Sequence, residues 1–287
     1  MPINADAAGS EFGPTEAYWT SKDCLLYAIG VGAGLDELAF TTENTSGVDQ
    51  LVLPTFPCVA MAAERIRSSE GGNFFAALGT FNFAMLVHGE QGVTLHKPLP
   101  TDAEFLSTGK VTGVYDKGSG AVIASESLAT DKATGEPLFT LRQSVFIRGE
   151  GGFGGERGPA AVKLDFDRPA DHVVTYHTRL DQALIYRLSG DRNPLHSDPS
   201  FAKMGGFDTP ILHGLCSFGF TGRALLHTVC EGDPARFVSM DGRFSKPVFP
   251  GDALTVSIWI EGDRALFRTE RAPGEVVIDS GVCVFTD

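Results

Sequence analysis

The sequence predicts an α+β protein made of two similar halves, each with one long buried helix wrapped by an antiparallel sheet. Three observations support this fold class: strand-like alternation of apolar and polar residues, one stretch that is apolar on all sides, and an ordered internal repeat. The 287 residues are 43% hydrophobic, enough to form a sizeable core. This composition excludes a disordered or low-complexity protein.

In the second half, residues 210–228 carry apolar side chains around most of a helical circumference, which is typical of a buried helix. A turn-rich segment at 189–200 precedes this helix. The segments that follow it alternate apolar and polar residues, so we expect antiparallel strands. These strands are expected at residues 236–244, 253–261, 265–270 and 275–285.

The first half shows a similar pattern, with a helical region expected at about residues 73–87. Strands are expected to follow this region at residues 110–115, 121–128 and 137–147.

Three short matches in the same order indicate that the halves arose by duplication. They pair residues 97–102 (KPLPTD) with 246–252 (KPVFPGD), His88 and Gly89 with His213 and Gly214, and residues 26–30 with 185–189. A glycine-rich stretch between the halves is typical of a linker. We therefore expect domains at 1–148 and 161–287, joined by a linker at 149–160.

Charge and cysteine usage narrow the function classes. The formal net charge of −13 argues against binding to nucleic acid or to an anionic membrane surface. The five cysteines are far apart with no CxxC pair, which disfavours a disulfide scaffold or zinc ribbon, and no metal site is predicted. We expect a cytoplasmic protein, because no signal peptide, membrane span or peroxisomal C-terminal signal is visible.

One short irregular stretch gathers groups that can do chemistry. Asp191, Asn193 and His196 follow Gly190, within the turn-rich segment that precedes the expected buried helix. These residue types are common in turns, so a purely structural role is one interpretation. A catalytic role is the other, because histidine exchanges protons near neutral pH and a nearby carboxylate can orient it or share the proton transfer.

Residues 186–202 resemble the signature of the MaoC-like, or hydratase 2, family of (R)-specific 2-enoyl-CoA hydratases. That signature has an aromatic and an aliphatic residue, then Ser/Thr-Gly-Asp-x-Asn-Pro-aliphatic-His and a small residue soon after. The matching positions are Tyr186, Leu188, Ser189, Gly190, Asp191, Asn193, Pro194, Leu195, His196 and Ala202. The duplication over residues 15–287 resembles the double hot-dog form of the family, with a helix in a curved sheet and a degenerate, non-catalytic N-terminal half.

The resemblance implies reversible addition of water across the C2–C3 double bond of a trans-2-enoyl-CoA, giving the (3R)-hydroxyacyl-CoA, as in fatty acid β-oxidation. It implies that Asp191 and His196 activate water and move protons, and that the Asn193 amide helps to hold them. The backbone N–H of Gly214 matches the family's oxyanion donor, a role that suits a helix N-terminus. No separate cofactor is expected, since coenzyme A is part of the substrate.

Substrate-binding residues are less specified by the sequence. Arg192, Lys97, Arg243 and Lys246 are candidates for the coenzyme A phosphates, with ordinary surface charge as the alternative. The apolar residues that could line a tunnel for a medium, long or bulky acyl group, a sterol side chain included, are Phe74, Phe75, Phe81, Phe83, Met85 and Leu86. Simple core packing is the alternative for these side chains.

Two other functions stay open at this stage. The same residues could dehydrate a (3R)-hydroxyacyl group carried by an acyl-carrier protein. The chain could also be a non-catalytic acyl-CoA-binding subunit, although such a protein has no need of a proton-transfer pair. Members of the family often form dimers, so the resemblance also allows a homodimer.

Overall fold

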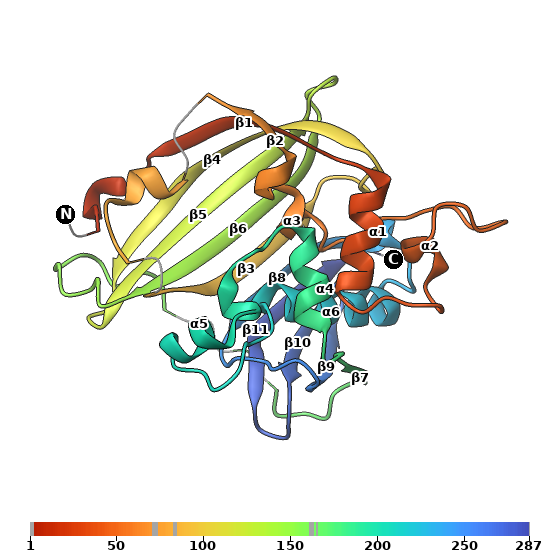
Figure 1. Ribbon diagram of the computed structural model, residues 1–287. Coiled ribbons are helices and arrows are strands. Elements are labelled where there is room, and N and C mark those ends of the chain that lie inside the picture. The colour runs from red at the N-terminus through yellow and green to blue at the C-terminus, as the bar shows by residue number, and fades with distance from the viewer. Residues whose placement is uncertain (1–2, 71–73, 83–84, 161–163, 165, 287) are drawn as a thin grey trace.

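A computed structural model describes residues 3–70, 74–82, 85–160, 164 and 166–286. Within this part of the chain, eleven strands form one antiparallel sheet, and the longer helices lie against one of its faces (Figure 1). The strand order is β2-β1-β4-β5-β6-β3-β8-β11-β10-β9-β7. The strands are β1 (Glu11–Trp19), β2 (Ile66–Ser69), β3 (Leu86–Leu95), β4 (Ala103–Asp116), β5 (Gly120–Asp131), β6 (Pro137–Arg148), β7 (His172–His177), β8 (Phe237–Phe244), β9 (Ala253–Glu261), β10 (Arg264–Glu270) and β11 (Val276–Phe285).

Apart from the edge strand β2, which has no counterpart, the strand order reads the same from both sides of the β3–β8 pair, which confirms the duplication. From the centre outward, the first half contributes β3, β6, β5, β4 and β1, and the second half contributes β8, β11, β10, β9 and β7. The halves meet where β3 pairs with β8, with Val93 opposite Met240. The two halves therefore share one sheet and bury their hydrophobic residues against it together.

Two of the repeated motifs occupy equivalent places and one does not. Residues 97–102 follow β3 and lead into β4, and residues 246–252 follow β8 and lead into β9. Residues 26–30 end the helix α1, and residues 185–189 span the end of its counterpart α4 and the turn after it. The third match is wrong: His88 lies in the strand β3, whereas His213 caps the helix α6.

The long helix expected at residues 210–228 is present as α6 (Gly214–Val229), and most of its side chains are buried. The other α-helices are α1 (Ser21–Gly30), α2 (Leu38–Thr41), α3 (Pro57–Ala60), α4 (Gln182–Tyr186) and α5 (Pro199–Met204). The 3₁₀ helices are η1 (Ala5–Ala7), η2 (Ala63–Arg65), η3 (Phe74–Leu78), η5 (Arg187–Ser189), η6 (Pro194–His196) and η7 (Pro234–Arg236). Within the described ranges, no helix is long and apolar enough to cross a membrane.

The helix expected at residues 73–87 is wrong. In the described part of this range the longest helical segment is η3 (Phe74–Leu78), and the chain is already in β3 from Leu86 onward. Gly79 has a φ of 91°, a left-handed conformation that cannot continue a right-handed helix. The apolar residues of this region that looked like one helix face are therefore divided between a short turn and a strand.

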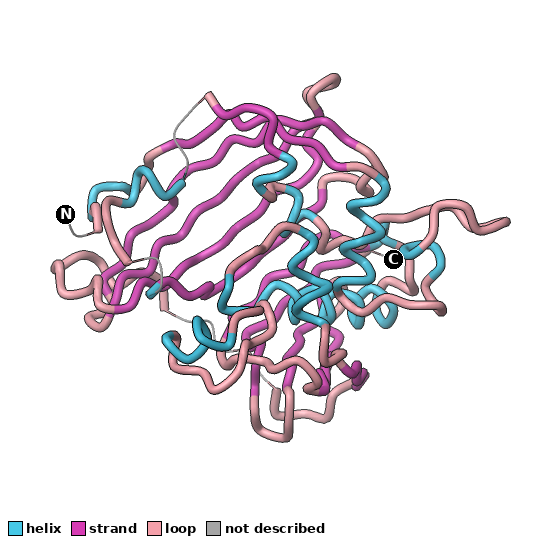
Figure 2. The backbone as a smooth tube through the Cα atoms, in the orientation of Figure 1, coloured by secondary structure: helices cyan, strands magenta, loops and turns pink. Residues whose placement is uncertain are grey.

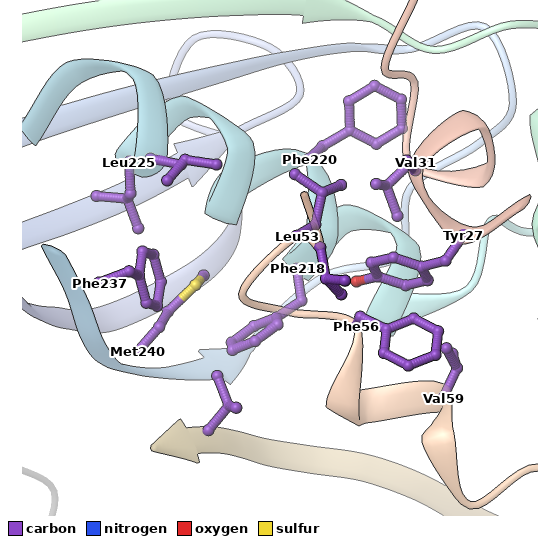
Figure 3. Packing of buried hydrophobic residues seen from close by; sticks show 14 of the residues in the cluster. Tyr27, Val31, Leu53, Phe56, Val59, Phe218, Phe220, Leu225, Phe237 and Met240 are labelled. Atoms are coloured by element: carbon purple, nitrogen blue, oxygen red, sulfur yellow. The ribbon is translucent and has the colours of Figure 1, made fainter. Parts of the chain in front are cut away.

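The main core joins both halves around α6. Phe218, Phe220 and Leu225 of α6 are fully buried, and Met240 of β8 lies on the sheet side of the same cluster. Figure 3 shows side chains from the first half, among them Tyr27, Phe56 and Val59, packed against these residues. A second, smaller apolar cluster lies in the first half alone and contains Leu78, Phe81, Val111, Ile123, Val145 and Ile147.

The expected linker, residues 149–160, contains no helix or strand. It is nevertheless tied to the first half, because the Asp116 carboxylate accepts hydrogen bonds from the N–H groups of Gly152 (2.9 Å) and Gly154 (2.8 Å). The domain limits at 148 and 161 remain a prediction.

Candidate active site

The polar motif of the second half lies on the loop between η5 and α5. Gly190 starts this loop with a φ of 120°, and a Cβ there would lie 2.2 Å from the Cβ of Ala62. The position therefore requires glycine on both conformational and steric grounds. Asn193 caps η6 by accepting the Leu195 N–H at 3.0 Å, and Asp191 accepts the Asn193 N–H at 3.1 Å.

The loop thus confirms part of the structural interpretation of the motif, since Asp191 and Asn193 do form its turns. His196, by contrast, does not cap the next helix. The N-terminus of α5 is capped by Asp198, whose carboxylate accepts the Ser200 N–H at 2.7 Å. The imidazole of His196 is therefore free of that structural task.

Three side chains converge next to this loop. The ligand-type atoms of Asp191, His196 and His213 all lie within 4.8 Å of one another. The rings of the two histidines stack, with centroids 3.7 Å apart and planes inclined by 28°. Residues separated by up to 22 positions are thus brought into one compact polar cluster.

Hydrogen bonds to backbone carbonyls fix both histidine rings. Nδ1–H of His196 donates to the carbonyl oxygen of Ile211 at 2.9 Å, which leaves Nε2 as its free proton acceptor. Nε2–H of His213 donates to the backbone carbonyl of Asp191 at 3.2 Å. His213 therefore holds the main chain of the residue whose carboxylate faces His196.

Burial keeps both rings in the neutral form at neutral pH. Desolvation lowers the pKa of His196 below its ordinary value of 6.5, although the Ile211 carbonyl and the Asp191 charge oppose this shift. The pKa of His213 falls to about 3, first because of burial and then because of the neighbouring His196. A neutral His196 can take a proton from water, which a charged imidazolium cannot do.

The N-terminus of α6 lies beside this cluster. Gly214 is the first residue of the helix and directly follows His213. The first N–H groups of a helix have no partner within it and carry a positive partial charge. The position of Gly214 therefore fits an N–H group that stabilises developing negative charge on a substrate oxygen.

The first half supplies neighbours that the sequence did not reveal. His88 of β3 lies with its ring centroid 5.0 Å from that of Phe244, and a Cβ on Gly214 would lie 3.4 Å from the same Phe244 ring. Burial lowers the pKa of His88 to about 4, and the charge of Asp191 is among the effects that oppose this. Arg65 donates to the backbone carbonyl of Ser189 at 3.1 Å.

No sequence motif marked these residues, because their proximity depends on how the halves pack. His88 was singled out only as part of a repeat that the structure does not support.

The four candidate coenzyme A contacts lie in different places. Arg192 is exposed next to Asp191 and lines a surface pocket of about 460 Å³ together with residues of the first half. Lys246 is exposed in the segment after β8. Arg243 precedes Phe244 in β8, and alternation places it on the opposite sheet face from Phe244. Lys97 pairs with Glu136 of the first half at 2.8 Å.

The structure therefore brings Arg192 near the cluster, and it does not gather all four cations there.

The candidate acyl-lining residues are grouped in the first half. Phe81 belongs to its second apolar cluster, and Phe74 packs against that cluster. The ring of Phe75 lies 5.1 Å from that of Phe74 and 6.4 Å from that of Phe81. Met85 is partly exposed, and Leu86 packs on the cluster. Phe83 lies outside the described residues. This arrangement agrees with core packing and with an acyl-binding surface alike.

Comparisons with known proteins cover nearly the whole chain. The MaoC like domain family matches residues 163–280, and the MFE-2 hydratase 2 N-terminal domain family matches residues 18–149. The chain is 46% identical to 3-hydroxyacyl-thioester dehydratase Y of Mycobacterium tuberculosis, over 98% of each chain. It is 38% identical to the probable enoyl-CoA hydratase 2 of Dictyostelium discoideum, over 94% of this chain and 92% of the relative.

A solved structure agrees with these relatives. The MaoC-like dehydratase from Phytophthora capsici is 34% identical to this chain and superimposes with a TM-score of 0.85. The match covers 99% of this chain and 98% of the other. Sequence and structure comparisons therefore agree over both halves.

Proposed function

The chain belongs to the MaoC-like hydratase 2 family, and we propose that it reversibly adds water to the C2–C3 double bond of a trans-2-enoyl-CoA. The product is the (3R)-hydroxyacyl-CoA, in keeping with the family. One observation carries the proposal: Asp191 and His196 lie together beside the start of α6. Proton-transfer groups and an oxyanion donor are the parts that this reaction needs.

In this proposal each group has one task. Water sits between the Asp191 carboxylate and the free Nε2 of His196, and these groups take one proton as the water oxygen bonds to C3. The pair returns one proton to C2, so that the sum of the steps is the addition of one water molecule. The Gly214 N–H stabilises the enolate character of the thioester oxygen between these steps. No metal ion or redox cofactor is needed.

The direction of net reaction depends on the supply of substrate rather than on the site. The same groups run the dehydration of a (3R)-hydroxyacyl thioester, and one relative is named for that direction. The coenzyme A thioester is preferred in our proposal over a carrier-protein thioester, because relatives named enoyl-CoA hydratase 2 align over most of the chain.

The test is an absorbance assay with crotonyl-CoA and trans-2-decenoyl-CoA, followed by chiral analysis of the product. We expect loss of the enoyl absorbance and formation of the (3R) alcohol, with turnover by H196A lower by about 10² to 10⁴. H172A is the matched control, because His172 is exposed at the start of β7. Faster turnover of a matched acyl-carrier-protein substrate would favour the carrier-protein dehydratase. Binding without turnover would favour the non-catalytic subunit.

A homodimer and a cytoplasmic location complete the proposal. Leu180, Leu184 and Leu188 are exposed at a spacing of four residues along α4 and its flanks, which suits an apolar contact. The five cysteines are free, as expected in a reducing compartment. Light scattering tests the dimer, with L184E expected to weaken it, and cell fractionation tests the location.

A further inference from the structure

Arg65 of the first half is almost completely buried, although it carries a permanent charge. Its Nη1 donates to the carbonyl oxygens of Val59 (2.8 Å) and Ser189 (3.1 Å), and its Nη2 donates to Ser189 at 3.2 Å. Its Nε lies 3.4 Å from the Asp23 carboxylate, which supplies the opposite charge. The guanidinium thus bridges a segment of the first half to the second half.

Arg65 binds the carbonyl of Ser189, the last residue before the loop of residues 190–198 that carries Asp191 and His196. We call this segment the catalytic loop. Ser189 ends η5, Gly190 follows it, and Asp191 is next. Ala62, three residues before Arg65, packs so closely on Gly190 that no side chain fits between them. The first half therefore fixes the entry to the loop by a charged hydrogen bond and by steric contact.

The other anchors of the loop come from the second half. His213 holds the carbonyl of Asp191, and the carbonyl of Ile211 holds His196. Without Arg65, the Ser189 carbonyl would lose both of its donors in a buried place, at the desolvation cost of an unpaired acceptor. The loop would relieve that cost by shifting, and Asp191 would shift with it.

We propose that Arg65 is a positioning residue for the hydration reaction, and that the first half in this way helps to set the geometry of the catalytic carboxylate. The inference rests on the proposed function. Arg65 acts through the Ser189 carbonyl and touches no reacting atom. A lysine could supply one charge but not the planar fork that reaches two carbonyl oxygens.

The test compares R65M, R65A and R65K with R67M as the matched control. Arg67 lies two residues further on, is exposed, and pairs with Glu104 and Glu16 at the surface. We expect kcat of R65M to fall roughly 10²-fold with little change in KM, as for an angstrom-scale misplacement of a reacting group. R65K should retain an intermediate kcat, and R67M should match the wild-type enzyme.

Two further readouts separate positioning from stability and from acyl binding. The loss in kcat should be equal for crotonyl-CoA and trans-2-decenoyl-CoA, because Arg65 acts on the reacting end of the substrate. Added guanidinium ion should restore part of the kcat of R65A and none of that of H196A. A folded R65M with wild-type kcat, or a loss confined to the longer substrate, would overturn the inference.

Hydrogen exchange keeps the test independent of activity. Amides of the peptide spanning residues 187–197 should exchange faster in R65M and R65A than in the wild-type protein and R67M, at a temperature well below unfolding. Equal exchange in all of them would overturn the inference even if no substrate were turned over. An inactive wild-type enzyme whose R65M variant shows faster exchange would instead contradict only the proposed function.

Discussion

Both halves of the molecule contribute equivalent strands to the shared sheet, but they differ in the helices that face it. In the second half the strands cover α6, a helix of 16 residues whose N-terminus adjoins the loop that carries Asp191 and His196. In the first half, the described residues between α1 and β3 contain no helix longer than five residues. In Figure 2 the longer helices gather over one part of the sheet, while short 3₁₀ helices lie at its other end, near the N-terminus.

In the first half, other segments cover the face of the sheet that α6 covers in the second half. The end of α1 packs against α6, where a Cβ on Gly219 would lie 2.4 Å from Val31 and 2.8 Å from the Tyr27 hydroxyl, and part of the intervening chain does so too, since a Cβ on Gly222 would lie 2.5 Å from Thr55. Another part forms the separate apolar cluster around Phe81. Both halves retain the sheet, which they need for burial, while the long helix terminus and the polar loop to which we assign the chemistry are described in the second half alone.

The largest expected effect is the loss of kcat when Asp191 or His196 is replaced, since the first half has no equivalent of these two residues. D191N and H196A should each lower kcat by about 10² to 10⁴, the usual contribution of an acid–base group, without loss of fold. D36N is the matched control in the first half, since Asp36 is exposed on the turn after α1. The assay is hydration of trans-2-decenoyl-CoA, with circular dichroism as the check on folding. Near wild-type turnover by either catalytic variant would remove the distinction between the halves.

How far the sequence could predict these features depends on the range of the interactions involved. The helix α6 and the strands β8 to β11 were predicted within a few residues, because their periodicities are local properties. The motif from Asp191 to His196 could be identified because its residues are contiguous in the sequence and resemble a family signature. Arg65 and His88 could not be predicted, because neither lies in a local pattern and each reaches the site through packing between the halves. The helix expected at 73–87 failed because an apolar stretch alone does not distinguish a helix from a turn followed by a strand.

The next effect concerns the ion pair that ties the first half to α6. Glu37 lies 2.6 Å from His227 and also pairs with Arg223, which is itself buried. E37Q leaves the Arg223 charge without its partner, so we expect a loss of roughly 3–5 kcal/mol of stability in urea unfolding at neutral pH. E104Q, which alters an exposed pair within the first half, should leave stability nearly unchanged.

The interactions of Glu37 with Arg223 and His227 also make the folding stability depend on pH, with lower stability in acid. His227 and Arg223 lower the pKa of Glu37 from 4.5 to about 2, despite the opposing effect of burial. The unfolded chain therefore binds this proton at a higher pH than the folded protein does. The stability from Glu37 is complete above pH 4.5 and is lost as the pH falls toward 2. The difference in free energy of unfolding between the wild type and E37Q should accordingly narrow as the pH falls from 4.5 toward 2. A difference that stays constant over this range would contradict a lowered pKa of Glu37.

A smaller effect tests whether the second apolar cluster binds acyl chains. Phe81 is a buried member of this cluster, as are Ile123 and Val145. If the acyl chain runs here, F81W should lower kcat/KM for trans-2-hexadecenoyl-CoA about tenfold and leave that for crotonyl-CoA unchanged. F166W, in the second half beside Trp259, is the control. An unchanged chain-length profile in F81W would identify the cluster as packing only.

The smallest effect compares two lysines at equivalent places in the repeat. Lys246 follows β8, and two residues later the carbonyl of Val248 accepts the Leu212 N–H at 2.7 Å, next to His213. Lys97 follows β3 and is paired with Glu136 instead. If Lys246 contacts a coenzyme A phosphate, K246A should raise KM roughly two- to fivefold, the usual strength of an exposed ion pair, and added salt should reduce the difference. K97A should not change KM, because Glu136 already neutralises the charge of Lys97 within the first half. If both variants keep the KM of the wild type, both lysines belong to the solvated surface. If K97A raises KM more than K246A does, the coenzyme A phosphates lie against the first half.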